Sequence, residues 1–296
     1  MLASITAGVD SRATLATALG SDALDRVAWF TYVRDGSRWT DRADRRISTE
    51  LAEHYDLDHT LTALLELAPP PENFRNLIRA NAFREPSPEI ERALAAHPSH
   101  LPKIHIRSNL SEIGRAFYVR KRPVKKPRTG ADLAGIYRIS VKDADIDPQA
   151  WNDTVREFEH MHRVTRFGAA SRLVDGRDLF YWEHRMGAWH AQSTLETDVA
   201  YDSVSLYNSR AVIAALLGPT LRARMEDRHI KGVIGSADPY LIEVPFNPGP
   251  AIYKKPLPPT RRERIGTAIA GARESVRRNR YVRGARRRVK RLVSRK

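Results

Sequence analysis

Cysteine is absent from the 296 residues, which excludes disulfides, thiolate nucleophiles and any zinc site with a cysteine ligand. No apolar run approaches the ~20 residues that a membrane-spanning helix needs. Neither the charged region nor the long apolar region of a signal peptide stands at the start. These absences predict a cytoplasmic protein, and the 42% hydrophobic content predicts a globular chain of one or two domains.

Most of the chain also lacks an excess of either charge, although the whole chain carries +15. Residues 254–296 hold 17 of the 50 Lys and Arg and two of the 35 acidic residues, which leaves 33 of each charge in residues 1–253. Within this tail, residues 261–296 place apolar residues at helical spacing among arginines, which is typical of a basic amphipathic helix. We expect it to bind an anionic membrane surface, which would put the protein at the periphery of the inner membrane. Binding to nucleic acid phosphates and a solvated appendage are the alternatives.

Strand and helix signals alternate through the first 120 residues. Apolar β-branched runs predict strands, and amphipathic spacing predicts helices between them. The strands are expected at 2–6, 27–33, 59–61 and 103–106, and the helices at 12–19, 41–55 and 72–81. This alternation predicts an α/β fold with a parallel twisted sheet and flanking helices, in which ligands bind at the carboxyl ends of the strands.

Composition divides the chain into four parts. Residues 1–120 are the expected nucleotide-binding α/β half, and residues 121–136, rich in Pro, Gly and basic residues, are expected to form a mobile basic loop. Residues 137–253 form a mainly helical half, and residues 254–296 the basic tail. Within the helical half, helices are expected at 148–165, 177–192, 209–217 and 220–233, and the stretch DPYLIEVPFNPGP is expected to contain none.

The stretch SITAGVDSRATLA, near the start of the chain, has the pattern of a strand end, a tight loop and a helix N-terminus. Backbone N–H groups at such a terminus attract an anion together with the helix dipole. Thr6, Ala7 and Gly8 keep the backbone accessible, and Ser11 can donate its hydroxyl to a phosphate oxygen. Asp10 fits a Mg²⁺ ion between loop and phosphate, because Mg²⁺ prefers carboxylate oxygens. The alternative is a tight turn that binds nothing.

Within this stretch, TAGVDS resembles the pyrophosphate loop of N-type ATP pyrophosphatases, usually Ser/Thr-Gly-Gly-x-Asp-Ser/Thr, with Ala7 in place of the first glycine. The layout of residues 2–250 resembles the synthetase domain of asparagine synthase. RSNLSEIGRAFY stands in the place of that family's Gly-x-Gly-x-Asp-Glu-x-x-x-Gly-Tyr motif and SLYNSR in the place of its late helix. Glu112, Gly114 and Tyr118 match the motif, and Ser111 replaces its Asp.

This resemblance implies an ATP-dependent ligase that activates a carboxylate as an acyl-adenylate, releases pyrophosphate and passes the acyl group to ammonia or another amine. ATP and Mg²⁺ would be its cofactors. The pyrophosphate would be bound by Thr6, Ala7, Gly8, Asp10 and Ser11, with Asp10 also on the metal.

One acidic and three basic residues complete the expected site. The resemblance implies that Glu112 orients the substrate or accepts a proton, whereas an acid that stabilises a helix N-terminus is the equally simple alternative. Arg12, Arg107 and Lys231 are candidates for the cation on the leaving pyrophosphate, and a solvated helix residue is the simpler interpretation of Lys231.

Because these 296 residues contain no cysteine, they cannot supply a glutaminase cysteine nucleophile, so we expect the nitrogen to come from free ammonia, an amine or a nitrogen-donating partner protein. A chain shortened at its N-terminus, and inactive, is a further possibility. Two other functions stay open: a tRNA-modifying enzyme of the same loop superfamily, and a non-catalytic nucleotide-binding remnant tethered by its basic tail.

Overall fold

The computed structural model describes residues 1–34, 38–82, 87–96, 104–121, 124–138 and 147–249. Residues 1–248 form one compact unit, to which every element below belongs. The tail expected at 254–296, with its amphipathic segment 261–296, lies outside the described residues. The strands are β1 (Leu2–Ser4), β2 (Ala28–Val33), β3 (His59–Ala63), β4 (Ile104–Arg107) and β5 (Asp202–Ser205).

Helices account for most of the remaining elements. The α-helices are α1 (Val9–Gly20), α2 (Trp39–His54), α3 (Glu72–Asn81), α4 (Pro88–Ala95), α5 (Phe117–Lys121), α6 (Gly130–Arg138), α7 (Pro148–Val164), α8 (Phe167–Ala170), α9 (Gly176–Phe180), α10 (Ala191–Thr197), α11 (Arg210–Leu217), α12 (Leu221–Met225), α13 (Arg228–Ala237) and α14 (Tyr240–Glu243). The other helical turns are the 3-10 segments η1 (Leu24–Arg26), η2 (Leu64–Glu66) and η3 (Ser111–Arg115), and the π-helix η4 (Tyr181–His190).

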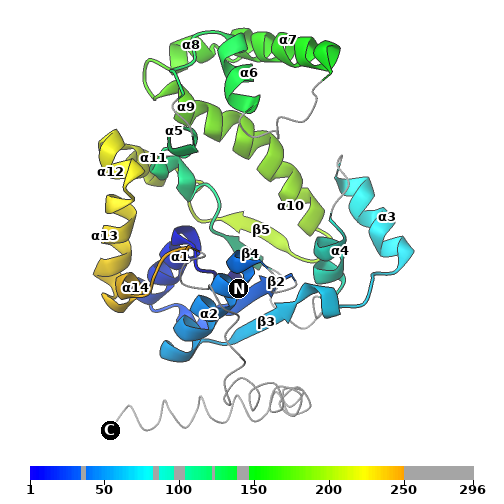
Figure 1. Cartoon of the computed structure of the whole chain (residues 1–296), viewed down its shortest axis with the longest axis vertical. Coiled ribbons are helices and arrows are strands. Elements are labelled where there is room, and N and C mark those ends of the chain that lie inside the picture. The colour runs from blue at the N-terminus through cyan, green and yellow to red at the C-terminus, as the bar shows by residue number, and fades with distance from the viewer. Residues whose placement is uncertain (35–37, 83–86, 97–103, 122–123, 139–146, 250–296) are drawn as a thin grey trace. The chain divides into compact units, whose positions relative to one another are not determined.

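The five strands form one parallel sheet in the order β3-β2-β1-β4-β5 (Figure 1). Leu2 of β1 pairs with Ala28 on one side and with His105 on the other. Strands β2 and β3 therefore extend the sheet on one side of β1, and β4 and β5 extend it on the other. This confirms the predicted α/β fold and puts its topological switch point between β1 and β4, where such sheets open a crevice for ligands.

Helices cover both faces of the sheet. The crossovers from β1 to β2 and from β2 to β3 contain α1 and α2, and α2 packs against both β2 and β3. On the other face, Leu2 and Phe30 join a buried cluster with Ile78 of α3, Leu94 of α4 and Tyr201. Right-handed crossovers place α1 and α2 on the same face, so the change of face also occurs at the switch point.

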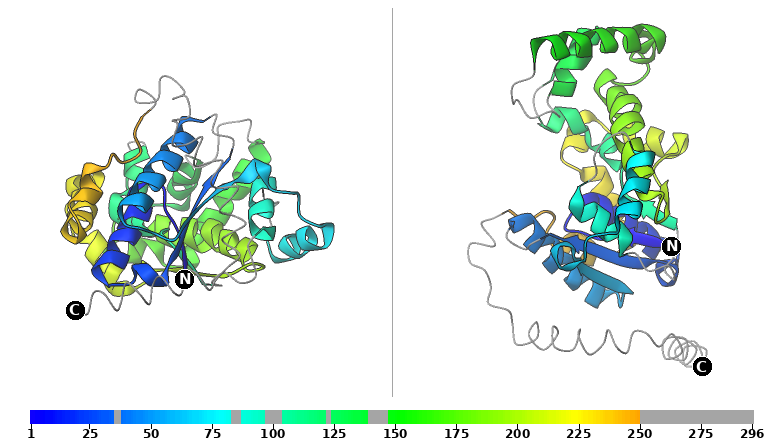
Figure 2. Two further views of the ribbon diagram at one scale, coloured as in Figure 1. Left: turned by 90° about the horizontal axis from the view of Figure 1, so that it is seen from below. Right: turned by 90° about the vertical axis from the view of Figure 1, so that its right-hand side faces the viewer.

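A second group of helices lies apart from the sheet in the same unit. Helices α6, α7 and α8 pack together, and both Figure 1 and the right-hand view of Figure 2 show them at the far end from the strands. The continuous segment α9-η4-α10 joins this group to the sheet, because α9 contacts α5 and α8 whereas α10 contacts α3 and β5. One long helical segment therefore spans from the helical group to the edge of the cavity described below.

Helix α6 occupies much of the stretch expected as a mobile loop at 121–136. A reciprocal cap starts it: the Asp132 backbone N–H donates to the Thr129 hydroxyl (3.2 Å), and the Thr129 N–H donates to the Asp132 carboxylate (3.0 Å). This is the capping-box arrangement, which satisfies two backbone donors at once. The Thr-x-x-Asp signal is present in the sequence, and the surrounding basic and proline residues outweighed it in the prediction.

The structure differs from the expectation in four further places. Strand β5 lies in the half expected to be mainly helical, and its four residues are too few for a clear alternation. The helix expected at 220–233 is divided at Asp227, whose φ of 58° ends α12 and precedes α13. The one-turn helix α14 lies in the stretch expected to contain no helix, and α4 has no counterpart in the prediction.

Among the described helices, none combines the length and the apolar character needed to cross a bilayer.

Candidate functional site at the sheet switch point

The loop between β1 and α1 stands at the carboxyl end of the central strand. Gly8 is the N-cap of α1 in an extended conformation (φ −75°, ψ 159°), and no side chain caps this helix end. A Cβ at Gly8 would lie 3.2 Å from the Thr6 hydroxyl, so a glycine lets the loop stay this tight. The helix N-terminus that the sequence predicts for anion binding is therefore present, with Asp10 and Ser11 in its first turn.

Protein groups already accept from each N–H of the loop. The Thr6 N–H donates to the Ser11 hydroxyl (3.1 Å), the Gly8 N–H to the Thr6 hydroxyl (3.1 Å), and the Ala7 N–H to the carboxylate of Asp44 in α2 (2.8 Å). Burial raises the pKa of Asp44, although the Ala7 N–H partly offsets this. An anion that binds to these three N–H groups must therefore replace the Asp44 carboxylate and the two hydroxyls as acceptors.

The segment after β4 forms the facing wall. Between Leu110 (φ 83°) and Ala116 (φ 51°), both in the left-handed region, η3 turns Ser111 towards α1. Arg224 of α12 holds η3 from behind, since its guanidinium donates to the carbonyls of Ile113 (2.6 Å) and Gly114 (3.3 Å). Arg224 is also paired with buried Asp178 (2.8 Å), which compensates its charge.

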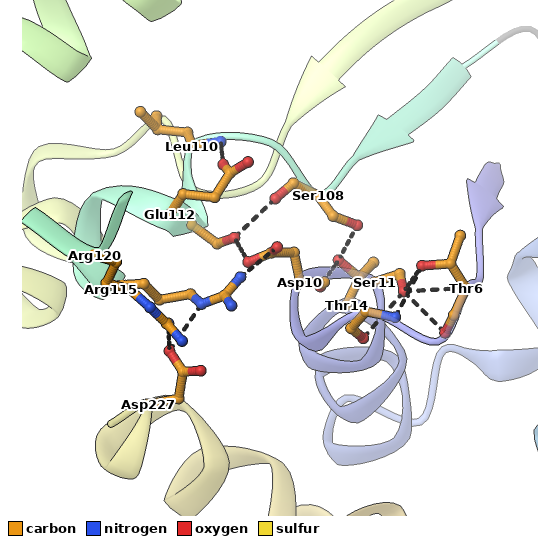
Figure 3. A network of polar contacts seen from close by, with 12 residues as sticks. Thr6, Asp10, Ser11, Thr14, Ser108, Leu110, Glu112, Arg115, Arg120 and Asp227 are labelled. Atoms are coloured by element: carbon orange, nitrogen blue, oxygen red, sulfur yellow. Dashed lines mark hydrogen bonds and ion pairs between the residues drawn. The ribbon is translucent and has the colours of Figure 1, made fainter. Parts of the chain in front are cut away.

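Glu112 of η3 lies beside Asp10 in a largely buried position (Figure 3). The Tyr181 hydroxyl of η4 donates to its Oε2 at 2.6 Å, and the Leu110 N–H donates to the same atom at 3.1 Å. Burial and the negative charge of Asp10 raise the pKa of Glu112 in spite of these bonds. A carboxyl whose pKa is shifted towards neutrality is suited to accept and return a proton.

Asp10 itself takes part in a network of side chains from three segments (Figure 3). The Ser111 hydroxyl donates to its Oδ1 (2.5 Å), and Arg115 Nη1 pairs with its Oδ2 (2.7 Å). Arg115 also donates from Nε to Asp227 (2.9 Å), and Arg120 pairs with the same Asp227 oxygen (2.5 Å). Burial opposes ionisation of Asp227, but the two arginines hold its pKa below the ordinary value.

These surroundings do not fit a Mg²⁺ ion bound by the protein at Asp10. Mg²⁺ needs several oxygen ligands in near-octahedral geometry, whereas one Asp10 oxygen already faces a hydroxyl donor and the other a guanidinium. At an effective dielectric of 20 and a separation of roughly 5 Å, a divalent ion and Arg115 would repel each other by at most about 7 kcal/mol. Within the described ranges, no three His, Asp or Glu side chains are grouped as metal ligands.

A cavity of about 650 Å³ opens between the loop and the η3 segment, within the size range of small-molecule sites. Its lining includes two kinds of side chain. Hydroxyls and carboxyls come from Thr6, Asp10, Ser11, Ser108 and Glu112, and the aromatic lining comes from Phe30, Tyr32, His105, Trp189 and Tyr201. A ligand with a polar and a planar apolar end would match this division.

The three candidate cations have different surroundings. Arg107, at the end of β4, lines the cavity, and burial lowers its pKa although Tyr201 and Glu196 offset this. Arg12 does not line the cavity: its guanidinium donates to the carbonyls of Leu241, Val244 and Pro245 at 2.5–3.0 Å. Lys231 in α13 places its amine 5.4 Å from the Phe246 ring, on the same side as Arg12.

The remaining sequence-predicted site residues are brought together. Thr6, Asp10, Ser11 and Glu112 line one cavity, and Ala7 and Gly8 form the loop backbone beneath. The chain after α14 also reaches this loop, because the Asn247 N–H donates to the Ala7 carbonyl at 2.9 Å.

Sequence reasoning missed several polar residues that determine the properties of the site. Arg115, Asp227 and Tyr181 act through contacts across 69 to 112 positions of sequence, which no local spacing reveals. Asp44 lies within a regular amphipathic helix and carries no separate signal. Arg115 lies within the stretch compared with the asparagine synthase motif, but that motif specifies no residue at its position.

Comparison with known proteins adds no relative. No family model, no curated protein and no solved structure matches this chain.

Proposed function

We propose that this chain is an ATP-dependent, adenylate-forming ligase of the kind that asparagine synthase represents, with its nucleotide in the cavity at the switch point. One observation carries the proposal: the Thr6–Ser11 loop and the Glu112 segment, far apart in sequence, line the same cavity at the carboxyl ends of adjacent strands. An α/β fold alone would not predict that these two motifs line one cavity, because such folds carry many different activities.

The phosphate end of ATP belongs at the loop. Backbone N–H groups of Thr6, Ala7 and Gly8, with the Ser11 hydroxyl, offer donors that now bond to protein acceptors and would turn to phosphate oxygens. The aromatic part of the cavity suits a planar base, and Arg107 offers a positive charge for a substrate carboxylate. ATP and a carboxylate would thus lie in one cavity.

Glu112 is the group we assign to proton transfer. Its raised pKa and its place in the cavity suit the removal of a proton from an amine that attacks the activated acyl group. Tyr181 positions this carboxyl by donating to one of its oxygens.

A backbone feature also agrees with the proposed likeness. Counted from Glu112, the last glycine of the asparagine synthase motif falls on Ala116, whose φ of 51° is a conformation that glycine adopts without strain. Gly114, which the sequence comparison matched instead, is needed for packing, because a Cβ there would lie 3.0 Å from Leu216 and 3.1 Å from His229.

The test is ATP–pyrophosphate exchange on the full chain across a panel of carboxylates that includes aspartate, with ATP binding measured by calorimetry in parallel. Exchange that depends on one carboxylate and falls at least about 100-fold in Ser11→Ala is expected, whereas Glu112→Gln should retain exchange and slow the later transfer of the acyl group to the amine at least about 100-fold. Absence of ATP binding would refute the proposal. RNA that co-purifies with the protein and restores exchange would instead favour the tRNA-modifying function.

A second candidate function is nucleotide binding without catalysis. It is favoured by the pairing of Asp10 with Arg115 and by the diversion of Arg12 to backbone carbonyls, which remove two charges from the expected catalytic set. ATP binding that is normal in the calorimeter, together with no exchange for any carboxylate or amine, would favour this function over the ligase.

A further inference from the structure

The Asp10 carboxylate has a complete set of partners within the protein. Oδ1 accepts from the Ser111 hydroxyl and Oδ2 from Arg115 Nη1, at 2.5 and 2.7 Å. Side-chain exposure is 26% for Asp10 and 15% for Arg115, so the pair is mostly shielded from solvent. Such shielding keeps a charge-assisted bond strong and limits competition from water.

Arg115 is fixed in this place by a second carboxylate. Its Nε donates to Asp227, which is 6% exposed in its side chain and precedes α13 with a φ of 58°. Arg120 donates to the same Asp227 oxygen. Two guanidiniums thus balance the carboxylates of Asp10 and Asp227, and both oxygens of Asp10 face donors of the protein where a divalent cation would need to bind.

Arg115 also approaches Asp10 from outside the cavity, because it is not among the lining residues, whereas Asp10 is. A ligand in the cavity therefore meets an aspartate already neutralised from behind. The loop can attract an anion only if the charge around it is not strongly negative. Arg115 meets this condition because its positive charge offsets that of Asp10.

We propose that Arg115 takes the place of a divalent metal as the fixed cation at Asp10, so that the loop receives a phosphate group without a metal ion bound by the protein. The phosphate part of this proposal rests on the proposed function, whereas the metal part concerns Asp10 and Arg115 alone. Asp10 then acts as a positioning residue that ties η3 to α1.

The metal part is tested with Mn²⁺ alone, by electron paramagnetic resonance on the full chain. Wild type is expected to show no saturable site up to about 1 mM Mn²⁺. The double variant Ser111→Asp, Arg115→Ala supplies two adjacent carboxylates and no guanidinium at Asp10, and should bind one Mn²⁺ with a Kd at least about tenfold below that 1 mM limit. The matched control, Ser111→Asp with Arg120→Ala, keeps Arg115 and should gain no site.

The phosphate part is tested by ATP binding to wild type in EDTA and in excess Mg²⁺. Affinities within about threefold of each other are expected, because neither the loop nor Asp10 needs the ion. A wild-type Mn²⁺ site that Asp10→Asn abolishes would overturn the proposal, whether or not the double variant folds. ATP binding only in Mg²⁺, with loss in Asp10→Asn, would overturn it as well. No ATP binding under either condition refutes the proposed function, and the Mn²⁺ result then decides the metal part by itself.

Discussion

Two sides of helix α1 each contact an arginine, and these two arginines have different partners. On the cavity side, Arg115 pairs with the carboxylates of Asp10 and Asp227. On the other side, Arg12, fully buried, donates to three backbone carbonyls after or within α14 and stacks on Phe246 at 3.9 Å. Carboxylates cancel the charge of an arginine, whereas carbonyls only solvate it, so burial lowers the pKa of Arg12 to about 10.

This difference indicates that adjacent residues of the loop motif serve separate purposes. Ser11 and Arg12 follow each other, but successive residues of a helix point about 100° apart. Ser11 therefore lines the cavity while Arg12 ties α1 to the end of the compact unit. On the cavity side, polar groups of the loop can exchange their protein partners for those of a ligand. On the other side, the contacts of Arg12 stabilise the fold.

The comparison is tested most strongly by Arg12→Ala. Loss of the guanidinium leaves three carbonyls of the α14 region without their donor, and we expect the free energy of unfolding to fall by about 3–5 kcal/mol. Urea denaturation measures this loss. Exposed Arg228, paired with Glu226 on the surface, is the matched control, and Arg228→Ala should change stability by less than about 1 kcal/mol. Equal losses in the two variants would contradict the assigned role of Arg12.

Ser11→Ala should have the opposite profile. It removes one hydroxyl that accepts from the Thr6 N–H and lines the cavity, so ATP affinity should fall about tenfold while stability falls by about 1 kcal/mol. Calorimetric titration with ATP and urea denaturation separate the two quantities. Ser21→Ala, at the exposed C-terminal end of the same helix, should leave ATP affinity unchanged. A stability loss in Ser11→Ala without a change in affinity would remove the loop from the binding site.

Asp44→Asn changes the acceptor of the Ala7 N–H, in the loop that precedes α1. Its carboxylate now accepts from the Ala7 N–H, so an entering phosphate must displace a negative group. Removing that charge should raise ATP or pyrophosphate affinity about threefold at pH 7. The raised pKa of Asp44 gives the sign of the pH effect: in wild type, affinity should rise as pH falls towards that pKa and Asp44 is protonated, and the variant should lose this component.

Exposed Glu53 in the same helix provides the control for Asp44. Glu53→Gln removes the same charge at a distance from the loop and should leave both the affinity and its pH dependence as in wild type. If Asp44→Asn instead weakens binding, Asp44 supports the loop in the bound state and does not compete with the ligand.

The sequence predicted the sheet and the loop because both depend on local signals. The strand at 27–33 and the helix at 72–81 are continuous apolar or amphipathic runs, and they appear as β2 (Ala28–Val33) and α3 (Glu72–Asn81). Strand β5 was missed because four residues with alternating exposure acquire their state from pairing with β4. Its formation depends on a neighbour that is about 100 positions away, which no window of sequence contains.

The site was predictable only as far as its loop. Thr6, Asp10, Ser11 and Glu112 lie in short motifs and line one cavity, as expected. The state of Asp10 was not predictable, because it depends on Arg115, which Asp227 holds from another helix. Arg12 was expected to bind the pyrophosphate because it follows the loop motif and is positively charged. Its guanidinium instead donates to carbonyls more than 200 positions later in the chain.

The smallest effect is expected for Lys231→Ala. Lys231 lies on the Arg12 side of α1, half-buried, with its amine 5.4 Å from the Phe246 ring and outside the cavity lining. Losing this contact should change stability by about 0.5 kcal/mol, and ATP affinity and exchange should stay within about twofold of wild type. Lys231→Met keeps the length of the side chain and separates packing from charge. A loss of exchange of tenfold or more in both variants, at unchanged stability, would mean that Lys231 reaches the phosphates when ligand is bound. The Arg12 side would then share in catalysis, and the division between the two sides of α1 would no longer hold.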